Sequence, residues 1–165
     1  MTDSGIEGVS FRPIGTVHSN TSGGKAPAGE GAASVIEIYK KFEEALDGLD
    51  GFSHLFVLCY FHRLRPEQIG PLRVKPRRLL NYGLSLEELP LLGVFALDSP
   101  TRPNPIGLSL VRLVGRSGRN LRVEGLDLFD GTPVLDIKPY QPQYRPETFA
   151  VPTWRSELSR RAGLA

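Results

Sequence analysis

The sequence predicts a mainly β protein with one domain and a few short helices, and three observations carry that prediction. The 165 residues are 40% hydrophobic and 23% charged, which is ordinary for a globular domain with a sizeable core. Eighteen glycines and fourteen prolines favour many turns over long helices. The apolar runs have strand length, and none approaches the ~20 residues that a membrane-spanning helix needs.

Apolar and branched residues recur in seven runs, each bounded by residues typical of turns. These runs predict strands at residues 14–18, 34–39, 54–61, 93–97, 108–116, 121–124 and 134–138, with a hairpin turn at 116–120. Short helices are predicted at residues 40–46 and 154–161. The capping-box spacing of Ser85 and Glu88 predicts one further helical turn.

The predicted domain covers residues 11–140, between a frayed, polar N-terminus (1–10) and a proline-rich tail (141–165). Residues 19–33 are dense in glycine, serine, alanine and proline, so they are interpreted as a mobile or binding loop. The N-terminus lacks the pattern of a secretory signal, and a single cysteine suits a reducing compartment. We therefore expect a cytoplasmic protein without a membrane partner.

The run at residues 54–61 is the most apolar of the chain and predicts a central strand. Cys59 lies within it, and no neighbouring cation or helix start would lower its pKa, so it reads as an inert core thiol. His54 and His62 share one face, but eight residues at ~3.3 Å each place them about 26 Å apart. One metal ion cannot bind both, and no metal site is predicted.

Three prolines stiffen the polar loop at residues 98–105, which carries Asp98, Arg102 and Asn104. A preset loop with a carboxylate, a guanidinium and an amide suits ligand recognition, although a stiff connection between two strands explains it equally well. Gly107 follows the loop and is interpreted as a place where a strand lets another backbone or a ligand approach closely.

Positive charge is concentrated in one segment, although the whole chain has a formal net charge of only +2. Residues 63–78 contain six basic side chains against one acid, Glu67. The segment is either a solvated charged loop or a surface that contacts phosphates. The six basic residues are Arg63, Arg65, Arg73, Lys75, Arg77 and Arg78.

A second polar loop, at residues 125–133, carries Asp127 and Asp130. Asp130-Gly131 is a strong turn signal, so Asp130 has either a structural or a functional role. The chain contains no phosphate-binding loop, no dinucleotide fingerprint, no zinc-protease motif and no nucleophile elbow. These absences disfavour kinases, hydride-transfer enzymes and serine hydrolases.

Three stretches, at residues 48–55, 99–109 and 125–140, together resemble the TsaA-like family, also called the TrmO family. The similarity runs from about Phe11 to Tyr140. The resemblance implies a β-barrel-like domain rather than the usual doubly wound methyltransferase fold. It also implies a homodimer that binds S-adenosylmethionine near the subunit interface. The implied reaction is methylation of N6 of threonylcarbamoyladenosine beside the tRNA anticodon.

The resemblance also implies which residues form the site. Arg102 and Asn104 match the family motif and either bind substrate or lock their loop. Apart from the resemblance, a base that takes the N6 proton would help methyl transfer, and the candidates in this sequence are His62, Tyr60 and Asp98. The basic segment would contact the tRNA. Seven positions match stretches that line the cofactor site in the family: Phe61, His62, Leu108, Asp127, Leu128, Phe129 and Asp130.

The chain departs from the family pattern at two positions. Asp98 and Ala28, which follows Pro27, stand where family members typically carry arginines. The longer tRNA-modifying members also have a second C-terminal domain beyond the matched region. Both features weaken the tRNA inference more than the cofactor inference. Two alternatives therefore stay open: a methyltransferase that acts on a small molecule, and a dimeric module that senses S-adenosylmethionine without catalysis.

Overall fold

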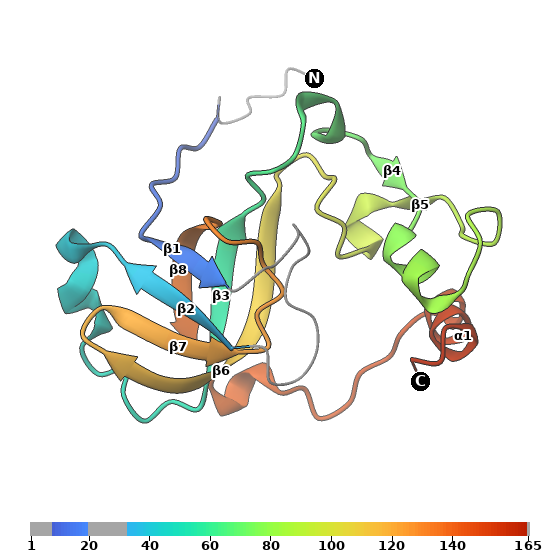
Figure 1. The fold of residues 1–165 in the computed structure, drawn as a ribbon. Coiled ribbons are helices and arrows are strands. Elements are labelled where there is room, and N and C mark those ends of the chain that lie inside the picture. Colours follow the sequence, from blue (N-terminus) through green and yellow to red (C-terminus); the bar gives the residue numbers. More distant parts are fainter. Residues whose placement is uncertain (1–7, 20–32, 165) are drawn as a thin grey trace, which may run out of the picture. The chain divides into compact units, whose positions relative to one another are not determined.

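The computed structural model describes residues 8–19 and 33–164 (Figure 1). The chain divides into two compact units. The first unit joins Met1–His62 to Ile106–Tyr140, and the second joins Arg63–Pro105 to Gln141–Ala165. The domain limits expected at residues 10 and 140 stay a prediction, and each unit is described here by itself.

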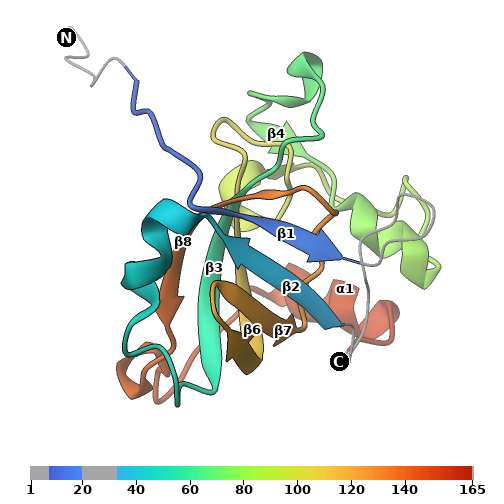
Figure 2. The ribbon, with the colours of Figure 1, turned by 60° about the vertical axis from the view of Figure 1, so that its left-hand side comes forward.

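The first unit is a closed antiparallel barrel with the strand order β1-β2-β7-β6-β3-β8. Figure 2 shows β1 and β2 side by side in this sheet. The predicted mainly β fold is therefore confirmed, with six of the predicted strands close to their expected places. The strands are β1 (Gly15–Ser19), β2 (Ala33–Ile38), β3 (His54–Tyr60), β6 (Ile106–Ser117), β7 (Asn120–Glu124) and β8 (Pro133–Pro139).

The barrel core comes from the two-residue alternation of these strands. In β3, Leu55, Val57 and Cys59 are fully buried, whereas Phe56 and Leu58 on the other face are only half-buried. This strand is central, as predicted, because it pairs with β6 on one side and β8 on the other. The buried cluster consists of Val17, Ile36, Ile38, Leu46, Leu55, Val57, Cys59, Val111, Leu121, Val123, Leu126, Leu128 and Val134.

The long strand β6 closes the barrel by pairing with two partners in turn. Its first half pairs with β3 and its second half with β7, and the register shifts between Leu113 and Gly115. Such an irregularity bends a strand and increases its twist, which closure of a barrel requires. The predicted hairpin between β6 and β7 is confirmed, with Gly118 at φ 57° in its turn. The predicted helix at 40–46 is the 3-10 helix η2 (Lys40–Leu46), which contributes Leu46 to the core.

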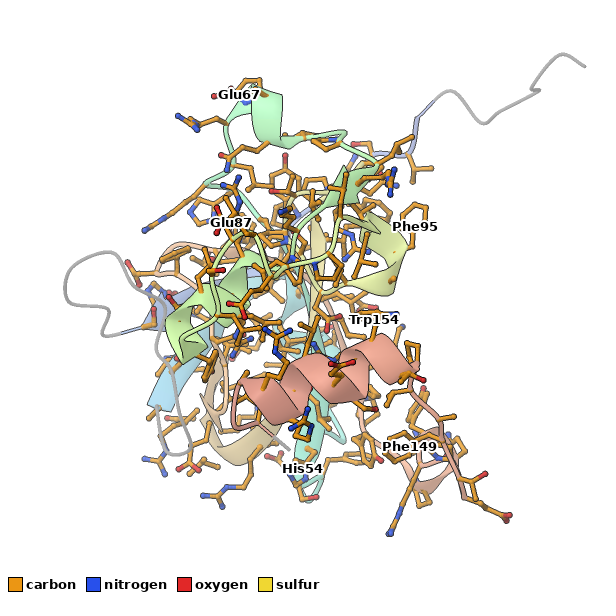
Figure 3. All side chains as sticks on the ribbon, turned by 90° about the vertical axis from the view of Figure 1, so that its right-hand side faces the viewer. His54, Glu67, Glu87, Phe95, Phe149 and Trp154 are labelled. Carbon is orange, nitrogen blue, oxygen red and sulfur yellow. The ribbon has the colours of Figure 1, made fainter. Side chains whose placement is uncertain are left out.

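The second unit is built mainly from short elements. Its apolar cluster contains Leu79, Leu84, Leu89, Leu158 and Ala162, with Trp154 packed against it. Figure 3 shows Trp154 on the C-terminal helix. The elements are η3 (Pro66–Gln68), β4 (Arg73–Val74), η4 (Arg77–Tyr82), β5 (Leu92–Gly93), η5 (Val94–Ala96), η6 (Pro142–Tyr144) and α1 (Thr153–Arg161).

The predicted strand at residues 93–97 is wrong. Only Leu92 and Gly93 pair with β4, and the chain then turns into η5, where the Leu97 N–H donates to the Val94 carbonyl at 3.2 Å. A two-residue ladder offers too few hydrogen bonds to extend the strand. The predicted helix α1 is confirmed. At the predicted helical turn, the Ser85 N–H donates to Glu88 Oε2 at 2.7 Å, which is one half of a capping box.

Candidate cofactor site

The end of β3 is packed against the start of β6 with no room for a side chain between them. A Cβ at Gly107 would lie 2.7 Å from Cys59 Sγ and 2.7 Å from Cζ of Phe61. A close approach of another backbone or a ligand was predicted at Gly107; the approaching groups are instead two side chains, a thiol and an aromatic ring. His62 follows directly and is exposed. The backbone thus fixes the Phe61 ring, whereas His62 faces solvent.

The Cys59 thiol at this position is buried, and its pKa is raised. Burial raises the pKa of the Cys59 thiol to about 11, a hydrogen bond with the Gly107 backbone opposes this, and the Asp127 charge raises it further. The thiol therefore stays protonated at neutral pH, in agreement with its interpretation as an inert core residue. Phe61 and Gly107 lie beside this buried sulfur.

The loop that carries Asp127 is anchored by its apolar residues. Leu126 and Leu128 are buried in the barrel core, whereas Asp127 and Asp130 are exposed. The Leu128 side chain is therefore a core residue, and its carbonyl accepts the Ser19 hydroxyl at 3.3 Å. Of this stretch, only the carboxylates, the half-buried Phe129 and backbone groups are available to a ligand.

Asp130 has the structural role that its turn signal allowed. The Thr132 N–H and Oγ1 both donate to the Phe129 carbonyl, at 3.1 and 2.7 Å, and Gly131 has φ 79°. This closes a tight turn in which glycine relieves strain. Asp130 Oδ1 accepts the Ser19 N–H at 3.1 Å, which ties the turn to the end of β1. The hydrogen bond fixes the position of the carboxylate without burying it.

A chain of charges runs from Asp130 across the barrel surface. His18 Nδ1 lies 3.9 Å from Asp130 Oδ1, and His18 Nε2 lies 2.8 Å from Glu37 Oε2. Arg119 Nη1 lies 2.7 Å from Glu37 Oε1. The hydrogen bond with His18 and then the Arg119 charge hold the pKa of Glu37 below its usual value. The sequence analysis missed these residues, although the predicted strands 14–18 and 34–39 place His18 and Glu37 on one face if paired as a hairpin.

An open hollow adjoins Asp130. Within the described residues, the Ser34 hydroxyl is buried and has no hydrogen-bond partner. A buried hydroxyl of this kind is an unused binding group for a polar ligand. The hollow is lined by His18, Ser19, Ala33, Ser34, Val35, Arg122 and Asp130.

Leu108 offers its backbone rather than its side chain. Its side chain is 67% exposed on the outer face of the barrel, opposite Leu58. The pair Ser53–Leu113 is hydrogen-bonded, because the Leu113 N–H donates to the Ser53 carbonyl. The register between β3 and β6 has no shift, so hydrogen-bonded pairs alternate with non-hydrogen-bonded ones, and Leu58–Leu108 is a non-hydrogen-bonded pair. Because antiparallel pairs alternate, the N–H and C=O of Leu108 point away from β3. An adenine edge could be read by such a donor and acceptor pair.

A family model described as the tRNA-methyltransferase O N-terminal domain matches residues 20–145 of this barrel-containing chain. The chain belongs to the tRNA-methyltransferase O N-terminal domain family. The resemblance inferred from the sequence is therefore confirmed, and the three stretches predicted to line a cofactor site lie inside the matched region.

Individual relatives have names that agree with this family assignment. A probable S-adenosyl-L-methionine-binding protein of Pyrococcus abyssi is 40% identical over 141 residues, covering 82% of this chain and 70% of the relative. The tRNA (adenine(37)-N6)-methyltransferase of Escherichia coli is 40% identical over 123 residues, covering 72% of this chain and 48% of the enzyme. The chain thus spans about half the length of that enzyme.

The crystal structure of TrmO from Pseudomonas aeruginosa superposes with a TM-score of 0.66 at 35% identity, covering 87% of this chain and 61% of that chain. Similarity at this level covers more than the barrel strands alone. The barrel is therefore the fold of the tRNA-methyltransferase O N-terminal domain family, and it differs from the doubly wound fold that the sequence analysis excluded.

Three further predicted residues belong to the second unit. Asp98 and Asn104 are exposed, whereas the Arg102 side chain is half-buried and its Nη1 donates to the Ser99 carbonyl at 3.5 Å. The Arg102 carbonyl accepts the Gly70 N–H at 3.4 Å. These bonds support the interpretation of Arg102 as a residue that locks its loop. The other position at which the chain departs from the tRNA-methyltransferase O pattern, Ala28, lies outside the described residues.

Several basic side chains of the predicted basic segment make hydrogen bonds or ion pairs within the second unit. Arg73 Nη2 donates to the Leu91 carbonyl at 3.2 Å, and Lys75 Nζ donates to the Leu86 carbonyl at 2.8 Å. Arg65 Nε lies 3.0 Å from Glu67 Oε1. Of the six basic side chains, at least these three therefore also stabilise the local fold.

Across residues 8–19 and 33–164, no group of three or more His, Cys, Asp or Glu side chains is placed to hold a metal ion. The same residues include no helix with the length and hydropathy needed to cross a membrane.

Proposed function

We propose that this chain binds S-adenosylmethionine at the β3–β6 end of the barrel and methylates N6 of threonylcarbamoyladenosine beside a tRNA anticodon. One observation carries the proposal. In a barrel of the tRNA-methyltransferase O family, Phe61 and Gly107 meet at Cys59, and the buried Leu126 and Leu128 anchor a loop that presents the exposed carboxylate of Asp127. The name of the Escherichia coli relative, a tRNA (adenine(37)-N6)-methyltransferase, supports the choice of acceptor.

The exposed groups of the site suit this cofactor. S-adenosylmethionine, when bound, supplies an electrophilic methyl group on a positively charged sulfur. Asp127 and Asp130 present carboxylates that can accept hydrogen bonds from ribose hydroxyls or face the cationic amine and sulfonium. The backbone of Leu108 can read the adenine edge, and Phe61 offers an aromatic surface held in place by Gly107.

Catalysis in this site depends mainly on positioning. Methyl transfer needs in-line placement of the acceptor nitrogen and exclusion of water more than it needs chemical activation. The acceptor also loses a proton, and His62 and Tyr60 at the end of β3 are exposed groups that can take it. Asp98, in the second unit, is the third candidate. Arg102 and Asn104 are proposed to shape the loop that meets the substrate.

A homodimer is part of the proposal. The outer face of β3 and β6 carries a row of apolar side chains, in which Leu108 is 67% and Leu110 is 48% exposed. The Phe56 ring on the same face packs against Tyr140 at a centroid distance of 5.5 Å, with the ring planes tilted by 57°. An apolar sheet face of this kind suits a second copy of the chain better than it suits water.

A second candidate function keeps the cofactor without tRNA methylation. Asp98 replaces a cation that the family typically carries, and the Pyrococcus abyssi relative is named only as a binding protein. Methyl turnover on a metabolite extract, with none on tRNA, would indicate a small-molecule methyltransferase. Tight cofactor binding with no turnover on either pool would indicate a sensing module.

Calorimetric titration with S-adenosylmethionine tests the cofactor site. Asp130→Asn keeps an oxygen that can accept the Ser19 N–H but removes the charge, so a structural role alone predicts little change. We expect this variant and Asp127→Asn to weaken binding by about tenfold or more, because each removes a charge-assisted hydrogen bond.

The matched control is Asp50→Asn, which removes one carboxylate that is paired with Arg116 instead. It should bind like the wild type. Absence of saturable binding at millimolar cofactor would refute both candidate functions. Transfer of a labelled methyl group to tRNA that carries threonylcarbamoyladenosine then decides between them.

A further inference from the structure

The two units of the chain carry opposite net charge. The barrel unit contains nine arginines and lysines against twelve aspartates and glutamates, which gives a net charge of −3. The second unit contains eleven against six, which gives +5. The small overall charge of +2 hides this separation. A polyanion is therefore attracted to the second unit and repelled by the first.

The helix α1 belongs to the basic unit and is anchored by one face. Trp154, Leu158 and Ala162 follow the four-residue spacing that places side chains on one side of a helix. They pack with Leu79 of η4 and with Leu89 in one buried cluster. The opposite side of α1 is consequently turned to solvent.

The arginines of α1 divide into two kinds. Arg161 pairs with Glu88, which also accepts the Ser85 N–H, so this arginine ties the helix to its own unit. Arg155 and Arg160 are exposed, and within the described residues their side chains make no hydrogen bond or ion pair. Neither guanidinium group ties α1 to another element of its unit in the described part of the chain, so both are available to an external anion.

The same arrangement recurs in η4. Leu79 is 5% exposed and points into the shared cluster, whereas its neighbour Arg77 is exposed. Both elements therefore bury leucines against each other and present arginines outward. Guanidinium groups bind phosphates through paired N–H donors, and each neutralised phosphate releases counterions from the nucleic acid.

We propose that α1, together with η4, forms a surface that contacts the phosphate backbone of the tRNA. The helix lies beyond residue 145, where the match to the tRNA-methyltransferase O N-terminal domain ends, so it is outside the matched domain. The inference rests on the proposed function, since it needs an RNA substrate. It adds the element outside the family domain that would hold that substrate.

The test measures binding of unfractionated bacterial tRNA to the full chain over a range of salt concentrations. The double variant Arg155→Gln with Arg160→Gln should weaken binding about tenfold and lower the slope of log affinity against log salt by roughly 2, because two phosphates are no longer neutralised. The matched control, Arg12→Gln with Lys40→Gln, removes the same charge from the barrel unit and should change little. Trp154 fluorescence and S-adenosylmethionine binding should be unchanged in both.

Three results can be distinguished. A decrease of affinity and slope in the α1 variant alone supports the inference. Equal behaviour of the α1 variant, the control and the wild type overturns it while leaving the proposed function intact. If the wild type binds S-adenosylmethionine but no tRNA, or prefers anionic vesicles to tRNA, the inference and the RNA substrate both fall, and the cofactor site stands.

Discussion

The two units of this chain differ in how they are stabilised as well as in charge. The barrel buries a cluster of thirteen residues beneath continuous strand ladders, whereas the second unit buries five around a helix and 3-10 turns. A large core can hold side chains in fixed positions, which a cofactor site requires. A small core is sufficient to present cations to a flexible polyanion. The comparison teaches that the larger core and the excess of positive charge lie in different parts of the chain.

Each unit contains its own natural reporter. Cys59 is the only cysteine and lies in the barrel, and Trp154 is the only tryptophan and lies in the second unit. Because burial protects the thiol and keeps it protonated, alkylation of Cys59 follows opening of the barrel. Trp154 fluorescence follows the second unit. The comparison can therefore be tested unit by unit.

The largest expected effect is that of Leu55→Ala. Leu55 is fully buried in β3, so its truncation leaves a cavity that the surrounding ladders cannot close. We expect the free energy of unfolding of the barrel to fall by about 3–4 kcal/mol. Urea denaturation followed by Cys59 alkylation measures it. The control Leu110→Ala, which truncates a half-exposed side chain of β6, should cost far less, and similar decreases in both would contradict the description of the core.

A smaller effect is expected for Leu158→Ala. Leu158 is 5% exposed in a cluster of only five residues, which can partly collapse around the gap. We expect the free energy of unfolding to fall by about 2 kcal/mol, seen as an earlier urea transition in Trp154 fluorescence. The barrel transition, measured by Cys59 alkylation, should stay in place. If both transitions shift together, the two units unfold as one and the comparison fails.

The smallest expected effect is a loss of stability of the second unit at acid pH. Hydrogen bonding with the Ser85 backbone and side chain, and then the nearby Arg161 charge, hold the pKa of Glu88 below its usual 4.5. A group with a lowered folded pKa stabilises the fold above its unfolded pKa, and this contribution disappears as pH falls through the folded value. The Trp154 transition should therefore weaken below about pH 4.5.

Glu88→Gln should make the second unit less sensitive to pH in this range, and the measurement is the urea midpoint between about pH 7 and pH 3. Glu87→Gln, a neighbouring exposed glutamate, serves as the control. An unchanged pH dependence in the Glu88 variant would show that another group is responsible. The barrel transition measures the acid sensitivity of the first unit separately.

The sequence pattern predicted most of the strands for a physical reason, whereas the barrel itself was implied by the family resemblance. Each strand carries its own two-residue alternation and its own turn residues, such as Gly118 in the β6–β7 hairpin. The cofactor residues came from a resemblance of whole motifs, and their role stays a proposal. The strand at residues 93–97 was wrongly predicted because apolar content cannot show that only two residues will find a pairing partner.

What the sequence by itself determined is therefore local: strand positions, the helix α1, the close approach at Gly107 and the turn at Asp130. Only the tertiary structure decided which of these lie together. It brought Phe61 and Gly107 to Cys59, linked His18 to Glu37 and Asp130, and left Arg155 and Arg160 exposed. The physical reason is that pairing register and helix packing join residues far apart in the chain, and no local pattern specifies them.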